Sequence, residues 1–154
     1  LVADFCQYYA PFPLHEVIFY YDSTALGSNY AVNDQDFQWV ITHELQKHGW
    51  RVRPVYIGVP MRHMEKYTLI NRGFAGQARL VPYFNEAQNQ DLLVSVQTAG
   101  VYNGKKDKRG EKLAETEEDK LESRTDGSDA FDTLYIGCER FPQQAFVLRV
   151  TGGG

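Results

Sequence analysis

The stretch HEVIFYYDSTALG, residues 15–27, decides the fold of this chain. Its first seven residues are β-branched, aromatic and almost continuously apolar, a pattern that predicts a β-strand buried on both faces. Asp22 follows at once, and small residues then make a turn. Residues 1–14 contain Pro11 and Pro13, and we expect them to be a lead-in or linker.

Helical and strand patterns alternate after this stretch. Apolar residues recur at spacings of three and four where we expect helices, and short β-branched runs mark the strands. Alternation of this kind predicts an α/β fold, with a mixed, mainly parallel central sheet flanked by helices. The expected elements are helices at 34–48, 61–74, 89–99 and 128–138 and strands at 52–57 and 80–84, with a possible short strand at 147–148.

Two of these elements carry further expectations. Pro54 lies within the strand at 52–57 and favours a sheet edge or a bulge, because proline lacks the donor for one ladder hydrogen bond. The helix at 128–138 should turn Phe131, Leu134 and Tyr135 toward the core.

Length and composition narrow the class of protein. The 154 residues fit one domain, which we place at residues 15–150 with a flexible tail at 151–154. The apolar fraction of 43% excludes wholesale disorder. No apolar run approaches the roughly 18 residues of a membrane helix, and the first residues lack the pattern of a signal peptide. Cys6 and Cys138 indicate two reduced thiols, as is usual in cytoplasmic proteins.

Charge is unevenly distributed along the chain. Residues 1–50 have a formal charge of −5, residues 51–112 of +6 and residues 113–154 of −5. Basic residues could therefore surround an acidic centre, although solvation of the surface explains the pattern equally well. Fourteen of the residues 105–124 are charged, so the segment 104–124 should be a mobile loop or an exposed hairpin.

Asp22 is the most informative single residue. Ligands of α/β sheets bind near the carboxyl ends of strands, where the sequence places this side chain. A carboxylate there is costly unless it is solvated, paired or bound to a cation. The alternative is that Asp22 only caps a turn through its own backbone.

Asp126 and Asp129 are three residues apart at the start of a predicted helix, so they share one face. Capping and the helix dipole favour aspartate there without any metal. Together with Asp22, however, they would offer the oxygen ligands that Mg²⁺ or Mn²⁺ prefers. Glu65 is the best nearby candidate for a further carboxylate ligand. The alternative interpretation is that Glu65 only lies on an exposed face of its helix.

Other catalytic motifs are missing from the sequence. It contains no phosphate-binding P-loop, no dinucleotide-binding glycine fingerprint and no nucleophile elbow. The four histidines form no HExxH or Cys/His zinc pattern.

Three stretches resemble the C-terminal nuclease domain of large terminase subunits from tailed phages: FYYDSTALG, KDKRGEKL and TDGSDAFDTL. That family has an RNase H-like fold related to RuvC-type resolvases. The resemblance implies that Asp22 is the acid ending the first strand, and that Asp126 and Asp129 are the acids opening the last helix. The family's middle acid usually ends the strand after the first helix, where this chain has Ile57 and Gly58, so Glu65 is our candidate for that role.

The resemblance also implies a function. The domain would cut concatemeric phage DNA during packaging, by hydrolysis assisted by Mg²⁺ or Mn²⁺, with two ions held by Asp22, Asp126 and Asp129. Its partners would be double-stranded DNA, an N-terminal ATPase domain of the same polypeptide, the portal and the small terminase subunit, in the cytoplasm of a bacterial host. The residues expected to track DNA phosphates are Lys105, Lys106, Lys108 and Arg109.

Three alternatives remain open at this point. The chain could be another nuclease of the same fold, such as a RuvC-like junction resolvase or a transposase-type nuclease. It could be a non-catalytic domain that docks DNA or the portal, which the missing middle acid favours. It could also be a general α/β binding domain in which Asp22 and Asp126 are only turn and cap residues.

Overall fold

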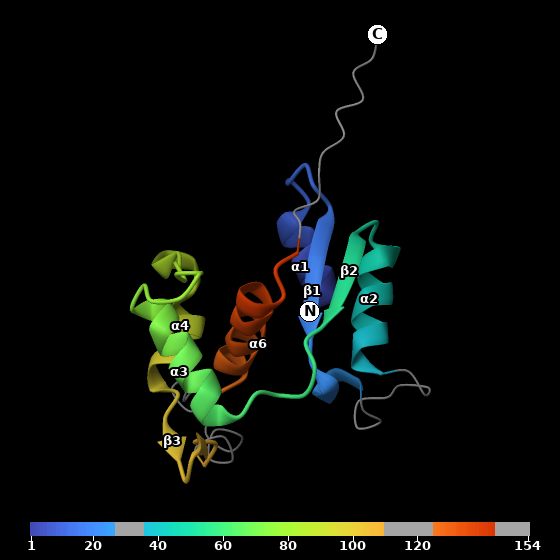
Figure 1. Ribbon diagram of the computed structural model, residues 1–154. Coiled ribbons are helices and arrows are strands. Elements are labelled where there is room, and N and C mark those ends of the chain that lie inside the picture. The colour runs from blue at the N-terminus through green and yellow to red at the C-terminus, as the bar shows by residue number, and fades with distance from the viewer. Residues whose placement is uncertain (27–35, 110–124, 144–154) are drawn as a thin grey trace. The chain divides into compact units, whose positions relative to one another are not determined.

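The computed structural model describes residues 1–26, 36–109 and 125–143 of the chain (Figure 1). Over these residues the protein is mixed α/β, with five α-helices and a small sheet of parallel strands. The described residues divide into two compact units, one made of residues 1–26, 36–58 and 141–143, the other of residues 59–109 and 125–140. The single domain expected over 15–150 therefore includes parts of both.

The first unit contains the strand–helix–strand arrangement that the sequence predicts. Strands β1 (Glu16–Tyr21) and β2 (Arg51–Tyr56) pair in parallel, with Glu16 opposite Arg51. Helix α2 (Phe37–Lys47) connects them and packs against β2 (Figure 1). Asp36 caps α2, because its side chain accepts a hydrogen bond from the backbone N–H of Trp39 at 2.8 Å.

Residues 1–14 are not the unstructured lead-in that we expected. Helix α1 (Val2–Tyr9) forms there and buries Cys6 against Leu45 and Trp50. The ring of Phe5 lies 5.1 Å from that of Trp50. The two prolines suggested a linker, but they lie beyond the end of a helix whose apolar residues recur at helical spacing.

Strand β1 differs from expectation in its burial. Each of its six residues is only half-buried, so the apolar run does not form a strand enclosed on both faces. Pro54 of β2 lies opposite Phe19 in a regular register without a bulge. Within the described residues β2 pairs only with β1, which is the edge position that Pro54 favours.

The second unit is mainly helical. Helices α3 (His63–Phe74), α4 (Gln90–Thr98) and α6 (Asp126–Arg140) confirm the three helices expected in this part of the chain. Both α3 and α4 pack against α6. Two short 3-10 helices complete the described elements, η1 (Ser23–Leu26) in the first unit and η3 (Glu86–Gln88) in the second.

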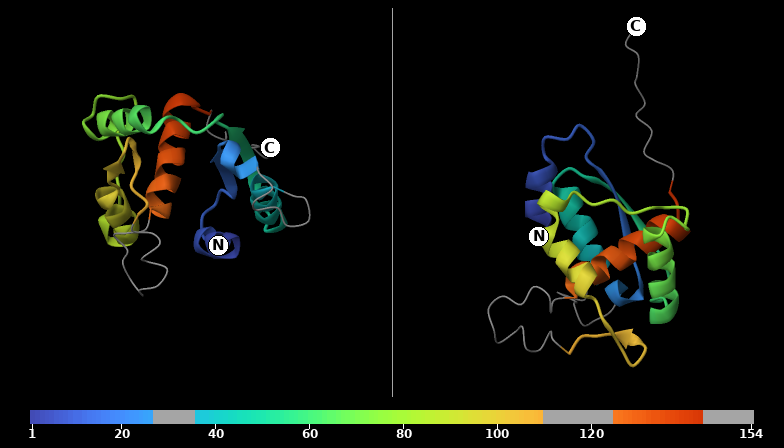
Figure 2. Two further views of the ribbon diagram at one scale, coloured as in Figure 1. Left: turned by 90° about the horizontal axis from the view of Figure 1, so that it is seen from below. Right: turned by 90° about the vertical axis from the view of Figure 1, so that its left-hand side faces the viewer.

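A short hairpin follows α4. Strands β3 (Val101–Tyr102) and β4 (Lys105–Lys106) pair antiparallel around Asn103 and Gly104. Both turn residues have positive φ angles, 50° and 72°, as a type I′ hairpin turn requires. Strand β4 of the hairpin packs against α3, and the turn of the hairpin projects beyond the helices (Figure 2). The rest of the predicted charged loop, residues 110–124, lies outside the described residues, as do the predicted strand at 147–148 and the tail at 151–154.

The strand expected at residues 80–84 is wrong. Side chains of α6, rather than a neighbouring strand, hold the backbone of Leu80. Glu139 accepts a hydrogen bond from the Leu80 N–H at 2.9 Å, and the Tyr135 hydroxyl donates to the Leu80 carbonyl at 2.9 Å. Backbone groups satisfied in this way need no sheet partner.

The buried face of α6 is also partly different. Phe131 and Tyr135 are buried as predicted, but Leu134 is 53% exposed. Ser128 and Asp132 take places on the buried face, four residues apart and therefore one turn apart. The inner face of α6 thus carries a polar stretch at its start. None of the described helices is long and apolar enough to cross a membrane.

Candidate functional site

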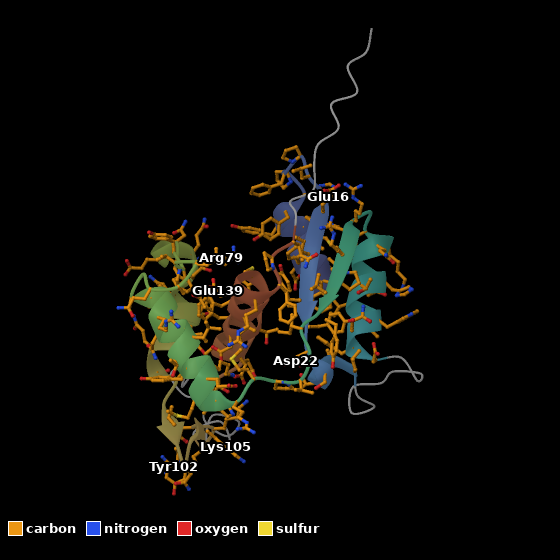
Figure 3. All side chains as sticks on the ribbon, in the orientation of Figure 1. Glu16, Asp22, Arg79, Tyr102, Lys105 and Glu139 are labelled. Atoms are coloured by element: carbon orange, nitrogen blue, oxygen red, sulfur yellow. The ribbon has the colours of Figure 1, made fainter. Side chains whose placement is uncertain are left out.

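Asp22 lies directly after β1, at the carboxyl end of the parallel pair (Figure 3). Its Oδ1 accepts hydrogen bonds from the backbone N–H of Thr24 at 2.9 Å and from the Thr24 hydroxyl at 2.5 Å. The N–H of Ser23 donates to the carbonyl of Gly58 at 2.9 Å, which ties this turn to the chain beyond β2. Asp22 therefore caps its turn and also stands where α/β sheets place functional groups.

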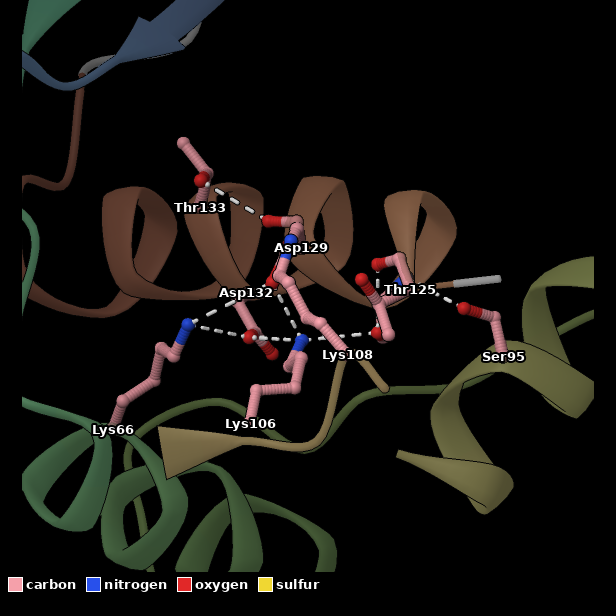
Figure 4. Close-up of polar contacts among 9 residues, drawn as sticks. Lys66, Ser95, Lys106, Lys108, Thr125, Asp129, Asp132 and Thr133 are labelled. Carbon is pink, nitrogen blue, oxygen red and sulfur yellow. Dashed lines mark hydrogen bonds and ion pairs between the residues drawn. The ribbon is translucent and has the colours of Figure 1, made fainter. Parts of the chain in front are cut away.

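The most distinctive feature of the second unit is a cluster of charged side chains around the start of α6 (Figure 4). Three elements supply it: α3, the chain at and after β4, and α6. We call it the lysine–aspartate cluster, and its members are Lys66, Lys106, Lys108, Asp129 and Asp132.

Asp132 is the buried acid of the lysine–aspartate cluster, with a side chain that is only 10% exposed. The ammonium groups of Lys66 and Lys106 each lie 2.8 Å from its Oδ2. Lys106 is itself 8% exposed and also contacts Asp129 Oδ1 at 2.7 Å and the Ser128 hydroxyl at 2.9 Å. These three contacts equal the number of donors on an ammonium group.

Local hydrogen bonds fix the start of α6 where the lysines meet it. The Ser95 hydroxyl on α4 accepts from the Ser128 N–H at 3.0 Å, and the Ser128 hydroxyl donates to the Thr125 carbonyl at 2.9 Å. Both serines are buried. The first turn of α6 is thus held by α4 rather than left free, which positions Asp129 and Asp132.

Asp129 is the more accessible acid, with a side chain 36% exposed. Its two oxygens face different lysines, Oδ1 toward Lys106 and Oδ2 toward Lys108 at 2.8 Å. Burial raises the pKa of Asp129, but the hydrogen bonds from these two lysines outweigh it and hold the pKa below its ordinary value. The carboxylate is therefore ionised at neutral pH.

The other predicted acids lie elsewhere on the second unit. Asp126 is exposed in the first turn of α6. Glu65 is exposed on a face of α3 that lines a groove with Arg72 and Arg140, whereas Lys66 faces Asp132. The structure does not bring Glu65 to the lysine–aspartate cluster, so the suggested middle acid finds no support from geometry.

The four basic residues expected to bind DNA have different surroundings. Lys106 and Lys108 are engaged with carboxylates, as described above. Arg109 hydrogen-bonds Asp107 at 2.7 and 2.9 Å, lowering the pKa of that acid to about 2, and its guanidinium lies 3.8 Å from the centre of the Tyr102 ring. Lys105 is exposed on the hairpin (Figure 3).

A pocket of about 110 Å³ opens beside the lysine–aspartate cluster. One face of α3 forms much of its wall, and the start of α6 and β4 add polar groups. His63 stands at its polar end, where burial, followed by the charge of Lys66, lowers the pKa of the imidazole. That histidine is therefore neutral at pH 7.

Sequence reasoning missed Lys66 and Asp132. A signal for Asp132 existed, because it is three residues after Asp129 and four after Ser128, and so shares their helix face. No comparable signal existed for Lys66, whose partner is far away in sequence.

Comparisons with family models, with curated proteins and with solved structures find no match to this chain. The resemblance to terminase nuclease domains therefore rests on the residues of the three stretches alone.

Proposed function

We propose that this chain is a metal-dependent DNA endonuclease domain with an RNase H-like fold, the nuclease domain of a tailed-phage terminase large subunit. It would cleave concatemeric phage DNA during genome packaging, using Mg²⁺ or Mn²⁺, two ions in all. Its partners would be double-stranded DNA, an ATPase domain of the same polypeptide, the portal and the small terminase subunit, in a bacterial cytoplasm.

The observation that carries this proposal is the position of Asp22. It follows the first strand of a parallel strand–helix–strand unit, and the chain gives it a fixed geometry through Thr24. Asp129, the acid that the resemblance assigns to the last helix, is ionised and partly accessible in the first turns of α6. Asp22 thus stands at the carboxyl end of a strand, where α/β folds bind ligands, and Asp129 stands in the first turn of a helix.

The acids of the second unit do not yet form a metal centre. Asp129 has the right ligand chemistry, but each of its oxygens already faces a lysine. Within residues 1–26, 36–109 and 125–143, no three His, Cys, Asp or Glu side chains gather as a metal-binding group. The residues therefore do not fit an ion as they stand, and we derive no catalytic step through one.

Positive charge beside the acids supports an association with DNA. Lys108 is half-exposed and Lys105 is exposed, so both can reach phosphate oxygens. Contacts of this kind give little sequence preference and a strong dependence on salt.

Nicking of supercoiled plasmid tests the proposal. The chain should nick plasmid in Mn²⁺ or Mg²⁺, lose the activity in EDTA, and cut linear duplex at least as well as four-way junctions. Strong preference for junctions would instead indicate a RuvC-like resolvase. No cleavage, combined with no change of melting temperature in millimolar Mn²⁺, would overturn the metal-dependent nuclease.

A second candidate is a DNA-docking domain without catalysis. The pairing of Asp129 with Lys106 and Lys108 favours it, because neutralised acids would not repel the phosphates of a bound duplex. Salt-dependent DNA binding without any Mn²⁺-dependent melting shift would support this candidate over the first.

A further inference from the structure

The pocket beside the lysine–aspartate cluster has two chemically different ends. Its α3 wall consists of residues at spacings of three and four, which therefore share one face of the helix. The start of that face is polar, with His63 and Lys66, and its end is mainly apolar, with Ile70 and Phe74 on either side of Asn71. A ligand that fills the pocket should likewise have a polar end and an apolar end.

The polar end favours an anion. Two ammonium groups line the pocket, those of Lys66 and Lys106, against one carboxylate, that of Asp132. Lys66 has one short contact, to Asp132 at 2.8 Å, and lies 4.0 Å from Asp129, whereas an ammonium can donate three hydrogen bonds. Lys66 can therefore donate a hydrogen bond to an anion in the pocket.

The apolar end is built from rings. Tyr67 is 54% exposed and Phe74 is 44% exposed, and the ring of Phe74 lies 5.9 Å from that of the buried Phe131. Val96 on α4 completes the wall. Exposed rings beside a positive charge are the arrangement that proteins use to stack unpaired bases next to a bound phosphate.

The size of the pocket agrees with such a ligand. One water needs about 10–15 Å³ of cavity volume, and a cavity of about 150 Å³ binds benzene. The 110 Å³ here therefore holds several waters or part of a base that also contacts solvent. A duplex keeps its bases stacked inside, and only an unpaired nucleotide could present a base to this pocket.

We propose that the pocket binds one unpaired nucleotide of a DNA strand, with its phosphate at Lys66 and His63 and its base against Tyr67 and Phe74. This inference rests on the proposed function and specifies its substrate: the domain would engage frayed or single-stranded DNA next to Asp129. The same chemistry is present in a free mononucleotide, so the test separates a strand from a free nucleotide.

The experiment measures fluorescence anisotropy with EDTA present, so that cleavage plays no part. The probes are a short oligo-dT strand, an abasic strand of the same length and charge, and a blunt duplex. The oligo-dT strand should bind more tightly than the abasic strand. The Tyr67→Ala variant should weaken oligo-dT binding by about tenfold, the scale of one lost base stack, and leave abasic binding unchanged.

Matched variants distinguish binding in the pocket from general effects of substitution on DNA binding. Met64 is 57% exposed on another face of α3, so Met64→Ala should alter neither probe's affinity. Lys66→Gln should weaken oligo-dT and abasic binding alike, and Lys66→Arg should restore both. Thermal melts of each variant establish that the fold is kept.

Three results would overturn the proposal: equal binding of the oligo-dT and abasic strands, no effect of Tyr67→Ala, or displacement of oligo-dT by an equal concentration of dTMP. The last would assign the pocket to a free nucleotide. Plasmid nicking in Mn²⁺ with no base-dependent binding would remove this inference and keep the nuclease. Base-dependent binding without nicking would keep the pocket and remove the nuclease.

Discussion

The turn after β1 and the start of α6 each contain an aspartate that is at least partly removed from water. The two carboxylates obtain their hydrogen-bond and ion-pair partners in different ways. Asp22 finds its partner two residues away, in the backbone and hydroxyl of Thr24. Asp132 finds its partners 66 and 26 residues earlier in the chain, on α3 and β4. The first carboxylate is stabilised by local structure, and the second only by the folded tertiary structure.

The difference between the two aspartates should be largest in the stability of their variants. Asp132→Asn leaves Lys66 and Lys106 buried without a full counter-charge, and we expect a loss of about 3 kcal/mol in the free energy of unfolding. Urea denaturation measures it. Asp126→Asn is the control, since Asp126 is exposed on the same helix and its variant should stay within about 0.5 kcal/mol of the parent. Equal small losses in both variants would mean that the cluster does not stabilise the second unit.

A smaller loss is expected at the turn. Asp22→Ala removes the acceptor for the N–H of Thr24, but that group is near the surface and can bind water instead. The expected cost is about 1 kcal/mol, the usual value of one hydrogen bond. If the melting of Asp22→Ala fell as far as that of Asp132→Asn, the contrast between local and tertiary stabilisation would be wrong.

These two sites also show what the sequence can predict. The strand before Asp22, helix α2 and strand β2 follow from patterns within short windows, and the Asp–Thr turn is readable from adjacent residues. The lysine–aspartate cluster cannot be predicted in this way, because no local sequence pattern shows that Lys66 and Lys106 will contact Asp132. The resemblance to terminases implied that Lys106 and Lys108 face DNA phosphates, whereas in the structure both lysines face the protein's own acids.

Two of the errors in the fold have the same origin. The strand expected at 80–84 failed because Glu139 and Tyr135, nearly 60 residues later, satisfy the backbone of Leu80. Leu134 is exposed because the buried face of α6 is set by its polar partners as well as by its apolar residues. Non-local partners decided each outcome.

A third, modest effect is expected on metal affinity, because Lys108 and a metal ion would compete for the carboxylate of Asp129. Lys108 is half-exposed, so its removal by Lys108→Met costs little stability but takes a cation away from Oδ2. If Asp129 takes part in metal binding, the variant should bind Mn²⁺ about twofold to fivefold more tightly, as exposed ion pairs are worth roughly 0.2–1 kcal/mol. Calorimetric titration measures the affinity, with Lys105→Met as the exposed control. Unchanged Mn²⁺ affinity in both variants would show that Asp129 is not a metal ligand.

The smallest effect concerns pH. The pKa of Asp129 is lowered in the folded state, so its contribution to stability is present above the unfolded pKa of about 3.9 and is lost as pH falls through the folded pKa. The stability difference between the parent and Asp129→Asn should be constant from about pH 5 to 7 and should shrink below about pH 4. Unfolding curves across this range measure it. A difference that shrinks as pH rises from 5 to 7 would contradict the lowered pKa.

The central claim is that Asp22 is a catalytic residue of a metal-dependent nuclease, and Asp36 provides the matched control. Both side chains accept a hydrogen bond from a nearby backbone N–H, Asp22 from Thr24 at 2.9 Å and Asp36 from Trp39 at 2.8 Å. Asparagine can keep each bond, so Asp22→Asn and Asp36→Asn should melt like the parent. The measurement is plasmid nicking in Mn²⁺ by both variants. The account predicts that Asp22→Asn abolishes nicking while Asp36→Asn retains it, and equal nicking by the two would show that Asp22 is only a turn residue.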